Sequence, residues 1–262
     1  MWLDSHAHLD DPDTAPAVLS AALRRLVDRG WQGALTAGYG PERFAASREL
    51  TAQWPQVRRA VGMHPEYLAR RVDDGARQAA HAALEAELAD PQVAAVGEIG
   101  LDKRYKAQWP LAEQLRYFRL GLRAARRRRL PVVLHIVGWY GHALTLLRAE
   151  GVPDGGAVHR WSGPLELVAA FEALGLGIAL ALEPRGSDEP RAHLARTVAA
   201  DKLLLETDWP FLALGYDEAV ADMAALGARV ALWRGEPLGE LAGRLNDNAR
   251  RLYRLEASAA AP

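Results

Sequence analysis

Short apolar runs alternate with longer segments of helical periodicity along most of the chain. The eight runs, rich in Val, Leu and Ile, are WLDSHAHL, GALTAG, RAVGMHP, VAAVGEIGLD, LPVVLHIV, GAVHRW, LGIALAL and KLLLETDWP. Between them, apolar residues recur every three or four positions, which is typical of amphipathic helices. Strands that alternate with helices in this way predict a parallel sheet whose strands are joined by right-handed crossovers.

The expected helices occupy the segments between these runs. They cover 15–29, 41–53, 75–89, 111–129, 140–150, 164–174 and 189–199, and a last helical stretch over 217–255 is interrupted near 235–237. Eight strand and helix units predict an α/β fold of the (β/α)₈ TIM-barrel type, which commonly needs about 250 residues. A doubly wound open sheet is the alternative. We expect one domain over 1–255 and a flexible tail over 256–262.

Composition excludes several classes of protein. Half of the residues are hydrophobic and a quarter are charged, as in ordinary globular chains, and the formal net charge is -1. That charge argues against a strongly basic surface for duplex DNA, although it allows a nuclease whose metal ions supply positive charge. No apolar run is long enough for a membrane span, and no signal peptide is expected. There is no cysteine, and the expected location is the cytoplasm.

Residues with metal-binding side chains stand where the expected strands end. Five of the eight histidines do so, together with one glutamate and one aspartate: His6, His8, His64, Glu98, His135, His159 and Asp208. In a barrel these strand ends surround the catalytic mouth. Side chains that are scattered along the sequence are therefore expected to converge in space.

Spacing and strand order divide these side chains into two groups. His6 and His8 are two residues apart on a strand and point the same way, and Asp208 arrives from the neighbouring eighth strand. These three are expected to bind one divalent ion, and His135 and His159 on adjacent strands a second one. Glu98 has two oxygens and is expected to bridge the ions. Imidazole and carboxylate ligands suit Zn²⁺, Mn²⁺ or related ions.

Each feature alone has a simpler interpretation. A single His-x-His pair arises by chance, a lone histidine in an apolar run is usually a core residue, and a carboxylate after a strand is often a helix N-cap. Six candidate ligands on five strands favour the metal site over these alternatives. His81 and His193 lack such a context and are expected at the surface, and His142 is expected to cap the helix after the fifth strand or to be solvated. The basic run RAARRRRL, residues 123–130, is expected at a helix C-terminus opposite the mouth.

The successive motifs resemble the TatD family of metal-dependent deoxyribonucleases. DSHAHLD, VGMHPEY, VGEIGLD, LPVVLHI, HRWSG, LLLETDWPFL and NDNARRLY match the family's blocks in order over nearly the whole chain. The resemblance implies a (β/α)₈ barrel with two divalent ions (Mg²⁺, Mn²⁺ or Zn²⁺) that degrades DNA. It implies the same ligand set and places His64 beside the scissile phosphate.

The chain departs from the family around the substrate. Val137 stands where the family usually has arginine, and Arg160-Trp161 replaces the usual Cys-Phe. The stretches 181–191 and 213–220 also differ from the family pattern. Expected substrate contacts are therefore Arg160, Trp161, Lys103, Arg104 and Trp209. Trp139, Tyr140, Phe211 and Lys106 are further candidates, and packing or solvation is the alternative for all of these.

The predicted function is a metal-dependent exonuclease that acts on single-stranded DNA. Asp208 is the expected general base, and Glu98 and His64 are the other catalytic residues. One alternative is a metallohydrolase of another ester, amide or lactone, because a fold does not determine a substrate. A second alternative is a barrel kept as a subunit of a complex with a protein partner. Otherwise a monomer is expected.

Overall fold

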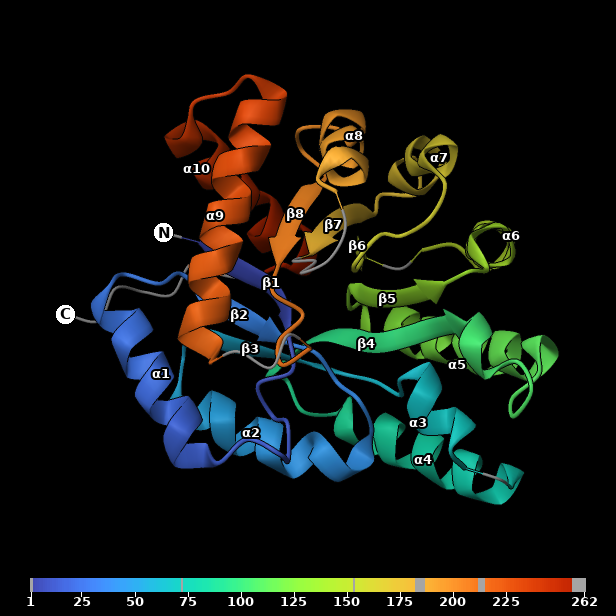
Figure 1. Ribbon diagram of the computed structural model, residues 1–262. Coiled ribbons are helices and arrows are strands. Elements are labelled where there is room, and N and C mark those ends of the chain that lie inside the picture. Colours follow the sequence, from blue (N-terminus) through green and yellow to red (C-terminus); the bar gives the residue numbers. More distant parts are fainter. Residues whose placement is uncertain (1, 72, 153, 182–186, 212–214, 256–262) are drawn as a thin grey trace.

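Eight parallel strands follow one another around the molecule in their sequence order in the computed structural model (Figure 1). The strands are β1 Leu3–Ala7, β2 Gly33–Thr36, β3 Val57–Val61, β4 Val93–Asp102, β5 Val132–Val137, β6 Gly156–Val158, β7 Gly177–Ala181 and β8 Leu203–Glu206. The structure describes residues 2–71, 73–152, 154–181, 187–211 and 215–255. The expected (β/α)₈ barrel is confirmed, and the sequential strand order excludes the doubly wound sheet.

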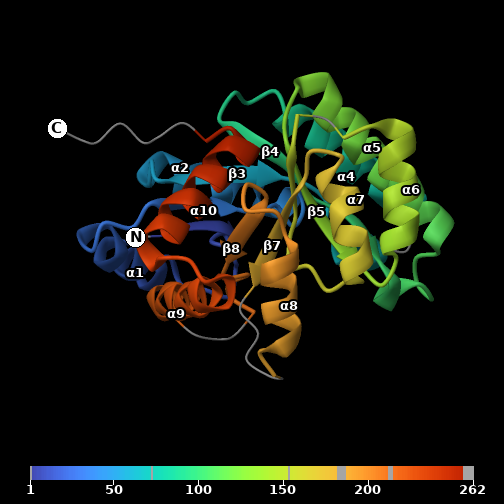
Figure 2. The same ribbon diagram turned by 90° about the horizontal axis from the view of Figure 1, so that it is seen from above.

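Helices surround the strands on the outside of the barrel (Figures 1 and 2). The α-helices are α1 Pro16–Asp28, α2 Phe44–Gln53, α3 Pro65–Ala69, α4 Asp74–Glu87, α5 Leu111–Arg128, α6 Tyr140–Glu150, α7 Val168–Glu172, α8 Glu189–Thr197, α9 Tyr216–Arg234 and α10 Leu238–Tyr253. Short 3₁₀ helices η1 Pro41–Arg43, η2 Lys103–Tyr105 and η3 Leu165–Leu167 precede α2, α5 and α7. The predicted interruption near 235–237 separates α9 from α10.

The first and last strands meet and close the barrel. At the mouth, the backbone N–H of Asp208 donates to the carbonyl of His6 at 3.0 Å, and that of His8 donates to the carbonyl of Trp209 at 2.7 Å. At the other end, Asn246 of α10 accepts a hydrogen bond from the backbone N–H of Leu3 at 2.8 Å. The seam therefore brings β1 and the segment after β8 into the same part of the mouth.

The barrel interior below the mouth is filled by apolar side chains, one or more from each strand. This cluster contains Leu3, Leu35, Ala60, Ala94, Ala95, Val133, Ala157, Ala179 and Leu204. Ala249, Leu252 and Tyr253 of α10 pack against it, so that helix closes the end of the barrel opposite the mouth. Figure 2 shows α10 on the same side as the chain's N-terminus. A solid interior of this kind confines ligands to the mouth.

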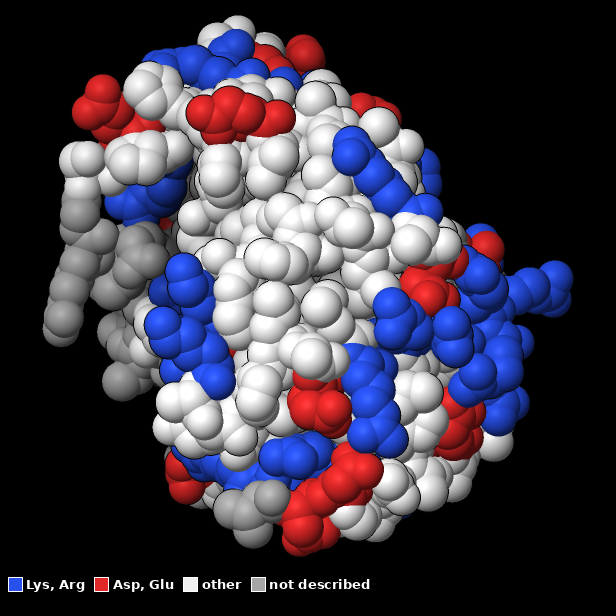
Figure 3. All heavy atoms as spheres, turned by 90° about the vertical axis from the view of Figure 1, so that its right-hand side faces the viewer, with Lys and Arg blue, Asp and Glu red and all other residues white. Residues whose placement is uncertain are grey.

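The basic run 123–130 forms the last turns of α5, as predicted. α5 ends at Arg128, and its C-cap Arg129 has a left-handed backbone (φ 52°). Arg123 pairs with Glu150 at 3.1 Å, and Arg127 pairs with Glu85. Lys and Arg side chains gather at one edge of the face in Figure 3, with acidic side chains among them. The positive charges of this run interact favourably with the helix dipole and with the acidic side chains beside them.

Two further expectations concern other parts of the chain. No helix among the described residues is both long enough and apolar enough to span a membrane. The tail expected over 256–262 lies outside the described residues, as do residues 182–186 of the departure from the family pattern after β7.

Candidate metal centre

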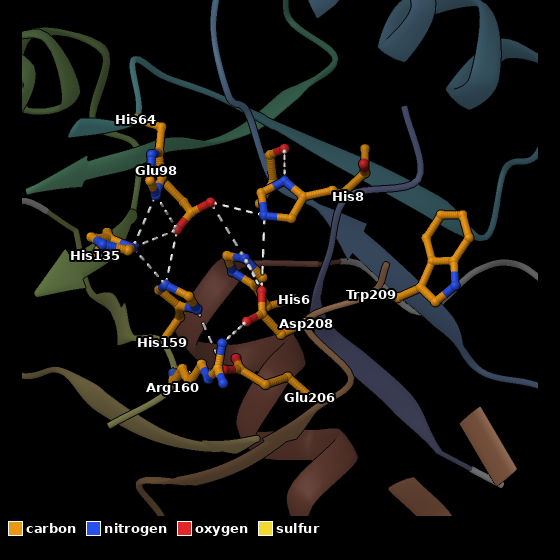
Figure 4. Close-up of polar contacts among 12 residues, drawn as sticks. His6, His8, His64, Glu98, His135, His159, Arg160, Glu206, Asp208 and Trp209 are labelled. Carbon is orange, nitrogen blue, oxygen red and sulfur yellow. Dashed lines mark hydrogen bonds and ion pairs between the residues drawn. The ribbon is translucent and has the colours of Figure 1, made fainter. Parts of the chain in front are cut away.

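The seven side chains expected at the mouth are brought together there, but they occupy different positions on their elements. His6 lies in β1, Glu98 in β4 and His135 in β5, whereas His8, His159 and Asp208 follow β1, β6 and β8, and His64 is the N-cap of α3. All but His8 are buried, and His8 is partly buried. The seven side chains thus gather at one end of the barrel, on residues far apart in sequence (Figure 4).

Glu98 differs from the expectation because it does not end its strand. β4 continues to Asp102, and its pairing with β5 shifts register between Val96 and Ile99. Ile99 and Leu101 continue the ladder beside Leu134 and Ile136 of β5, and Glu98 lies within the irregular step. Such irregularities re-aim a side chain without ending the strand.

The two carboxylate oxygens of Glu98 face two different groups of histidines (Figure 4). Its Oε2 lies 3.1 Å from Nε2 of His8 and 3.6 Å from Nε2 of His6. Its Oε1 lies 2.9 Å from Nε2 of His159 and 3.3 Å from Nδ1 of His135. One carboxylate therefore contacts both groups, which is the arrangement that a bridging ligand requires.

Asp208 completes the group around His6 and His8. Its Oδ1 lies 3.6 Å from Nε2 of His6 and 3.9 Å from Nε2 of His8. Its other oxygen, Oδ2, accepts a hydrogen bond from Nη1 of Arg160 at 3.0 Å. The oxygen toward the histidines and the oxygen toward the arginine are therefore different atoms of one carboxylate.

Acceptor oxygens beside the outer ring nitrogens orient three of the histidines, two of them through hydrogen bonds. Nδ1 of His8 lies 3.2 Å from the carbonyl of Ala37, and Nε2 of His135 lies 3.0 Å from Oδ2 of Asp102. Nδ1 of His159 lies 3.5 Å from Oε1 of Glu206. Because each outer neighbour is an acceptor, it favours the proton on the outer nitrogen. The inner nitrogen is then an electron-pair donor, which a metal ligand must be.

His64 has the opposite arrangement. Its Nδ1 accepts a hydrogen bond from the backbone N–H of Glu66 at 3.0 Å, so in the neutral ring the proton is on Nε2. That Nε2 points inward, 3.1 Å from Nδ1 of His135 and 3.9 Å from Oε1 of Glu98. Although His64 lies close enough to join a metal cluster, this tautomer makes it a hydrogen-bond donor rather than a ligand.

Burial and mutual charge shift the protonation of the centre. Burial lowers the pKa of His8, but its contact with Glu98 outweighs that effect and raises the pKa to about 9. Burial also opposes ionisation of Glu98, yet the surrounding histidines, His159 and His6 first, hold its pKa well below the usual range. Burial and the neighbouring His135 lower the pKa of His64, in agreement with a neutral ring.

The donor set fits divalent metal ions. Among the described residues, both ring nitrogens of His6 are buried without a hydrogen-bond partner, and the carboxylate oxygens of Glu98 and Asp208 lie 3.6 Å from its Nε2. Buried polar atoms normally have a partner, so these nitrogens are expected to bind one from outside the chain, such as a metal ion. Three overlapping groups have ligand atoms within 4.8 Å of one another: His6, His159 and Asp208; His6, His8 and Glu98; and His64, Glu98 and His135.

A pocket of about 640 Å³ opens above these residues. Its rim includes Tyr39, Arg43, Arg104, Tyr105, Arg160 and Phe211. The guanidinium carbon of Arg160 lies 3.7 Å from the ring centre of Phe211, and that of Arg43 lies 4.5 Å from the ring centre of Tyr39. The rim therefore combines arginine cations with aromatic faces, and the floor is the metal centre.

The expected substrate contacts divide into pocket residues and packing residues. Arg104 and Arg160 line the pocket. Trp161 is 8% exposed and packs on Tyr140 and Phe171, and Trp209 is 5% exposed and packs on Tyr216. Their rings are covered by neighbours, so the packing alternative describes them better than base stacking. Lys103 is exposed and is not among the described lining residues.

Several residues of the site were missed in the sequence. Asp102 and Glu206 contact the outer nitrogens of His135 and His159, and Tyr39 stacks near His64 with ring centres 5.4 Å apart. Glu206 ends β8 two positions before Asp208, and in the expected strand that period-two spacing is a signal that could have identified it. Asp102 stands four positions after Glu98, which is also a period-two spacing, but the strand was expected to end at Glu98 and in fact continues to Asp102.

Comparison with known proteins agrees with this geometry. The family model described as "TatD related DNase" matches residues 3–254. The "Uncharacterized metal-dependent hydrolase YjjV" of Escherichia coli K12 is 32% identical over 267 residues, which cover 96% of this chain and 97% of that protein. The "3'-5' ssDNA/RNA exonuclease TatD" of Shigella flexneri is 31% identical over 244 residues, covering 87% of this chain and 90% of that protein.

A solved structure shows the same fold over the same length. The crystal structure of the TatD homologue YjjV from Escherichia coli K12 has a TM-score of 0.83 and 27% identity, and the match covers 97% of this chain and 98% of that one. The resemblance found in the sequence motifs is thereby confirmed. The chain belongs to the family of TatD-related DNases and is a metal-dependent hydrolase of that family.

Proposed function

We propose that this protein is a metal-dependent 3′–5′ exonuclease that acts on single-stranded nucleic acid in the cytoplasm. The observation that carries the proposal is the position of Glu98, whose two oxygens face the His6–His8 group and the His135–His159 group separately. In the proposed ligand set, His6, His8 and Asp208 bind one ion, His135 and His159 bind the other, and Glu98 bridges them. A relative named as a 3′–5′ ssDNA/RNA exonuclease supports the choice of substrate.

Two divalent ions held in this way would activate a water molecule and neutralise the charge of a phosphodiester. The residues of the chain then have distinct tasks. Asp208 presents a carboxylate at the floor of the pocket and is the proposed proton acceptor. His64 directs its Nε2–H toward the same floor and can donate to an oxygen of the substrate phosphate, because its Nδ1 is occupied by Glu66.

The dimensions of the pocket support a chain end as the substrate. A space of about 640 Å³ above a solid barrel interior is comparable with a small-molecule site. Exposed Phe211 and partly buried Tyr39 offer aromatic faces at the rim, and such faces bind unpaired bases with little sequence preference. We therefore favour a flexible single strand over a duplex.

End-labelled oligonucleotides test this function directly. Single-stranded DNA and RNA are incubated with the protein and Mg²⁺ or Mn²⁺, beside Glu98→Gln and a surface control, Glu113→Gln on α5. Digestion from the 3′ end converts a 5′-labelled strand into a shortening ladder and releases a 3′-label as a mononucleotide at once. Glu98→Gln should abolish both patterns, and Glu113→Gln should retain them. Full activity in Glu98→Gln would contradict the proposal.

A second candidate function is hydrolysis of a neutral ester, amide or lactone. Ile136 and Val137 line one side of the pocket with apolar surface, at the place where the family resemblance leads one to expect an arginine. Protein that contains two ions, leaves every oligonucleotide intact and hydrolyses p-nitrophenyl acetate or a simple lactone would favour this candidate.

A further inference from the structure

Arg104 lies on the pocket rim and contacts one buried carboxylate, that of Asp102, through both its side chain and its backbone. Its Nε lies 3.0 Å from both oxygens of Asp102, its Nη2 lies 2.5 Å from Oδ2, and its backbone N–H donates to Oδ1 at 2.9 Å. Asp102 itself is fully buried, whereas the Arg104 side chain is 61% exposed. The arginine thus covers a carboxylate that has no exposed surface of its own.

The same carboxylate holds His135 from the opposite side. Oδ2 of Asp102 lies 3.0 Å from Nε2 of His135, and Nδ1 of that ring faces Oε1 of Glu98 at 3.3 Å. A continuous series of contacts therefore runs from the pocket rim to the inner nitrogen of His135: Arg104, Asp102, His135. Arg104 was expected to contact the substrate directly, but the hydrogen bonds described for its side chain are with Asp102.

Asp102 needs more than one donor to keep this position. Its backbone N–H donates to Oε1 of Gln114 at 2.8 Å, and its carbonyl accepts from Nε2 of Gln114 at 3.0 Å, so the main chain is held by α5. The side chain contacts only His135 and Arg104 among the described hydrogen bonds. The Arg104 guanidinium therefore holds the carboxylate on the side away from His135, while Gln114 holds the backbone in place.

An exposed ion pair by itself is usually a weak interaction. This one differs because one partner is buried and the contact is a forked, multiply hydrogen-bonded pair, which fixes geometry as well as charge. Carboxylates that hold a ligand histidine from behind commonly change metal affinity by about 10- to 100-fold when they are altered. Loss of the arginine that orients such a carboxylate is therefore also expected to lower the affinity for the metal ion.

We propose that Arg104 is a positioning residue that acts through Asp102 on His135 and thereby sets the affinity of the second metal ion. This inference rests on the proposed function, in which His135 and His159 bind that ion. It assigns Arg104 to assembly of the centre rather than to the substrate phosphate. The His6–His8–Asp208 group has no contact with Asp102 or Arg104 among the described hydrogen bonds and ion pairs, so its affinity should be independent of both.

Zn²⁺ titration of chelator-stripped protein tests the proposal without any substrate. Calorimetry should resolve two binding events in the wild type. Arg104→Gln should weaken binding of the ion assigned to His135 and His159 about tenfold or more. It should leave binding at the His6–His8–Asp208 group unchanged, and Asp102→Asn should have the same two effects. Arg104→Lys, which keeps the charge and loses the fork, should be intermediate. Arg43→Gln is the matched control, because Arg43 also lines the rim and pairs with an aspartate, Asp11 at 3.4 Å, whose side chain contacts no ligand histidine among the described hydrogen bonds and ion pairs.

His135→Ala separates a failure of this inference from a failure of the ligand assignment. If His135→Ala loses one ion and Arg104→Gln binds both normally, the positioning role is wrong and the assignment stands. If His135→Ala still binds two ions, or the wild type binds one, the assignment is wrong and the positioning role falls with it. Equal weakening of both events in Arg104→Gln would indicate a general structural effect and would also overturn the proposal.

Kinetics add a readout that separates positioning from substrate binding. For a substrate cleaved by the wild type, activity lost in Arg104→Gln should return at raised metal concentration, with KM for the substrate unchanged. A raised KM that persists at saturating metal would instead identify Arg104 as a substrate contact and contradict the positioning role.

Discussion

The backbone N–H of Glu66 donates to Nδ1 of His64 at 3.0 Å, and this one contact determines what the other side of the ring can do. With Nδ1 acting as acceptor, the neutral ring has its proton on Nε2, which points toward Glu98 and His135. The six other histidines and carboxylates of the centre can bind cations, but a ring that presents an N–H cannot. His64 thus lies at the metal centre and is chemically distinct from it.

His64→Ala should therefore leave two ions bound while reducing kcat. Removal of a preorganised donor that faces developing negative charge commonly lowers kcat about 10²- to 10³-fold. Metal content by mass spectrometry or atomic absorption, measured beside the rate of oligonucleotide cleavage, checks both parts. His159→Ala is the comparison, since it should lose an ion and the activity together. Loss of an ion in His64→Ala would show that His64 is a ligand after all.

Arg160 is expected to contribute to recognition of an anionic group. Its guanidinium lies over the ring of Phe211, which is 57% exposed, and contacts Asp208 through Nη1. Arg160 also lines the pocket above the metal centre, where its positive charge favours a bound phosphate. Arg160→Gln should weaken binding of thymidine 5′-monophosphate to the metal-loaded protein about tenfold or more and leave thymidine binding unchanged.

Calorimetry with these two ligands supplies its own control, because they differ only in the phosphate. Equal loss of affinity for both would indicate that Arg160 shapes the pocket rather than recognising charge. Unchanged affinity for both would remove Arg160 from the substrate contacts altogether.

Metal uptake should depend on pH through His8. The pKa of His8 in the metal-free protein is raised to about 9, so below that pH the ring holds a proton that an ion must displace. Affinity for the ion should therefore rise by about tenfold per pH unit for this proton between pH 6.5 and 9 and level off above that range. Calorimetry in two buffers of different ionisation enthalpy measures the protons released. Affinity that stays constant over this range would contradict the assignment of His8 as a ligand.

The sequence was sufficient for the order of the elements and for the set of converging side chains, because both follow from periodicity. Strand ends of a parallel barrel share one face, so residues such as His6 and Asp208 could be brought together without coordinates. Periodicity does not report a register shift, and Glu98 was accordingly placed at the end of β4 instead of inside it. It also does not report which tautomer a ring adopts, since the partner of His64 is a backbone group of the following helix.

The aromatic residues show a second limit. Trp161, Trp209 and Phe211 all follow strands, and nothing in their local sequence distinguishes them. Packing from other elements does: Phe171 of α7 covers Trp161 and Tyr216 of α9 covers Trp209, whereas Phe211 remains exposed. Exposure at a barrel mouth depends on residues far away in the chain, so it requires the three-dimensional structure.

The close approach of β3 and β4 behind Glu98 leads to the last prediction. A Cβ added at Gly62 would lie 2.3 Å from the carbonyl carbon of Gly97 and 2.6 Å from the backbone nitrogen of Glu98. Backbone cannot move aside as a flexible side chain can, so Gly62→Ala must displace the segment that carries the bridging carboxylate. We expect it to lower the free energy of unfolding by about 1–3 kcal/mol, as overpacking usually does, and to weaken metal binding in the molecules that remain folded.

Gly243→Ala is the matched control for this substitution. Gly243 lies in α10, where an added Cβ would meet nothing within 4 Å, so alanine should stabilise the helix by about 0.5–1 kcal/mol and leave metal binding unchanged. Urea denaturation with and without Zn²⁺ measures both effects, since the stability added by the ion reports its affinity for the native state. A Gly62→Ala protein that is destabilised and yet gains the wild-type increment from Zn²⁺ would show that the strand contact supports the fold alone, and that Glu98 keeps its place by other means.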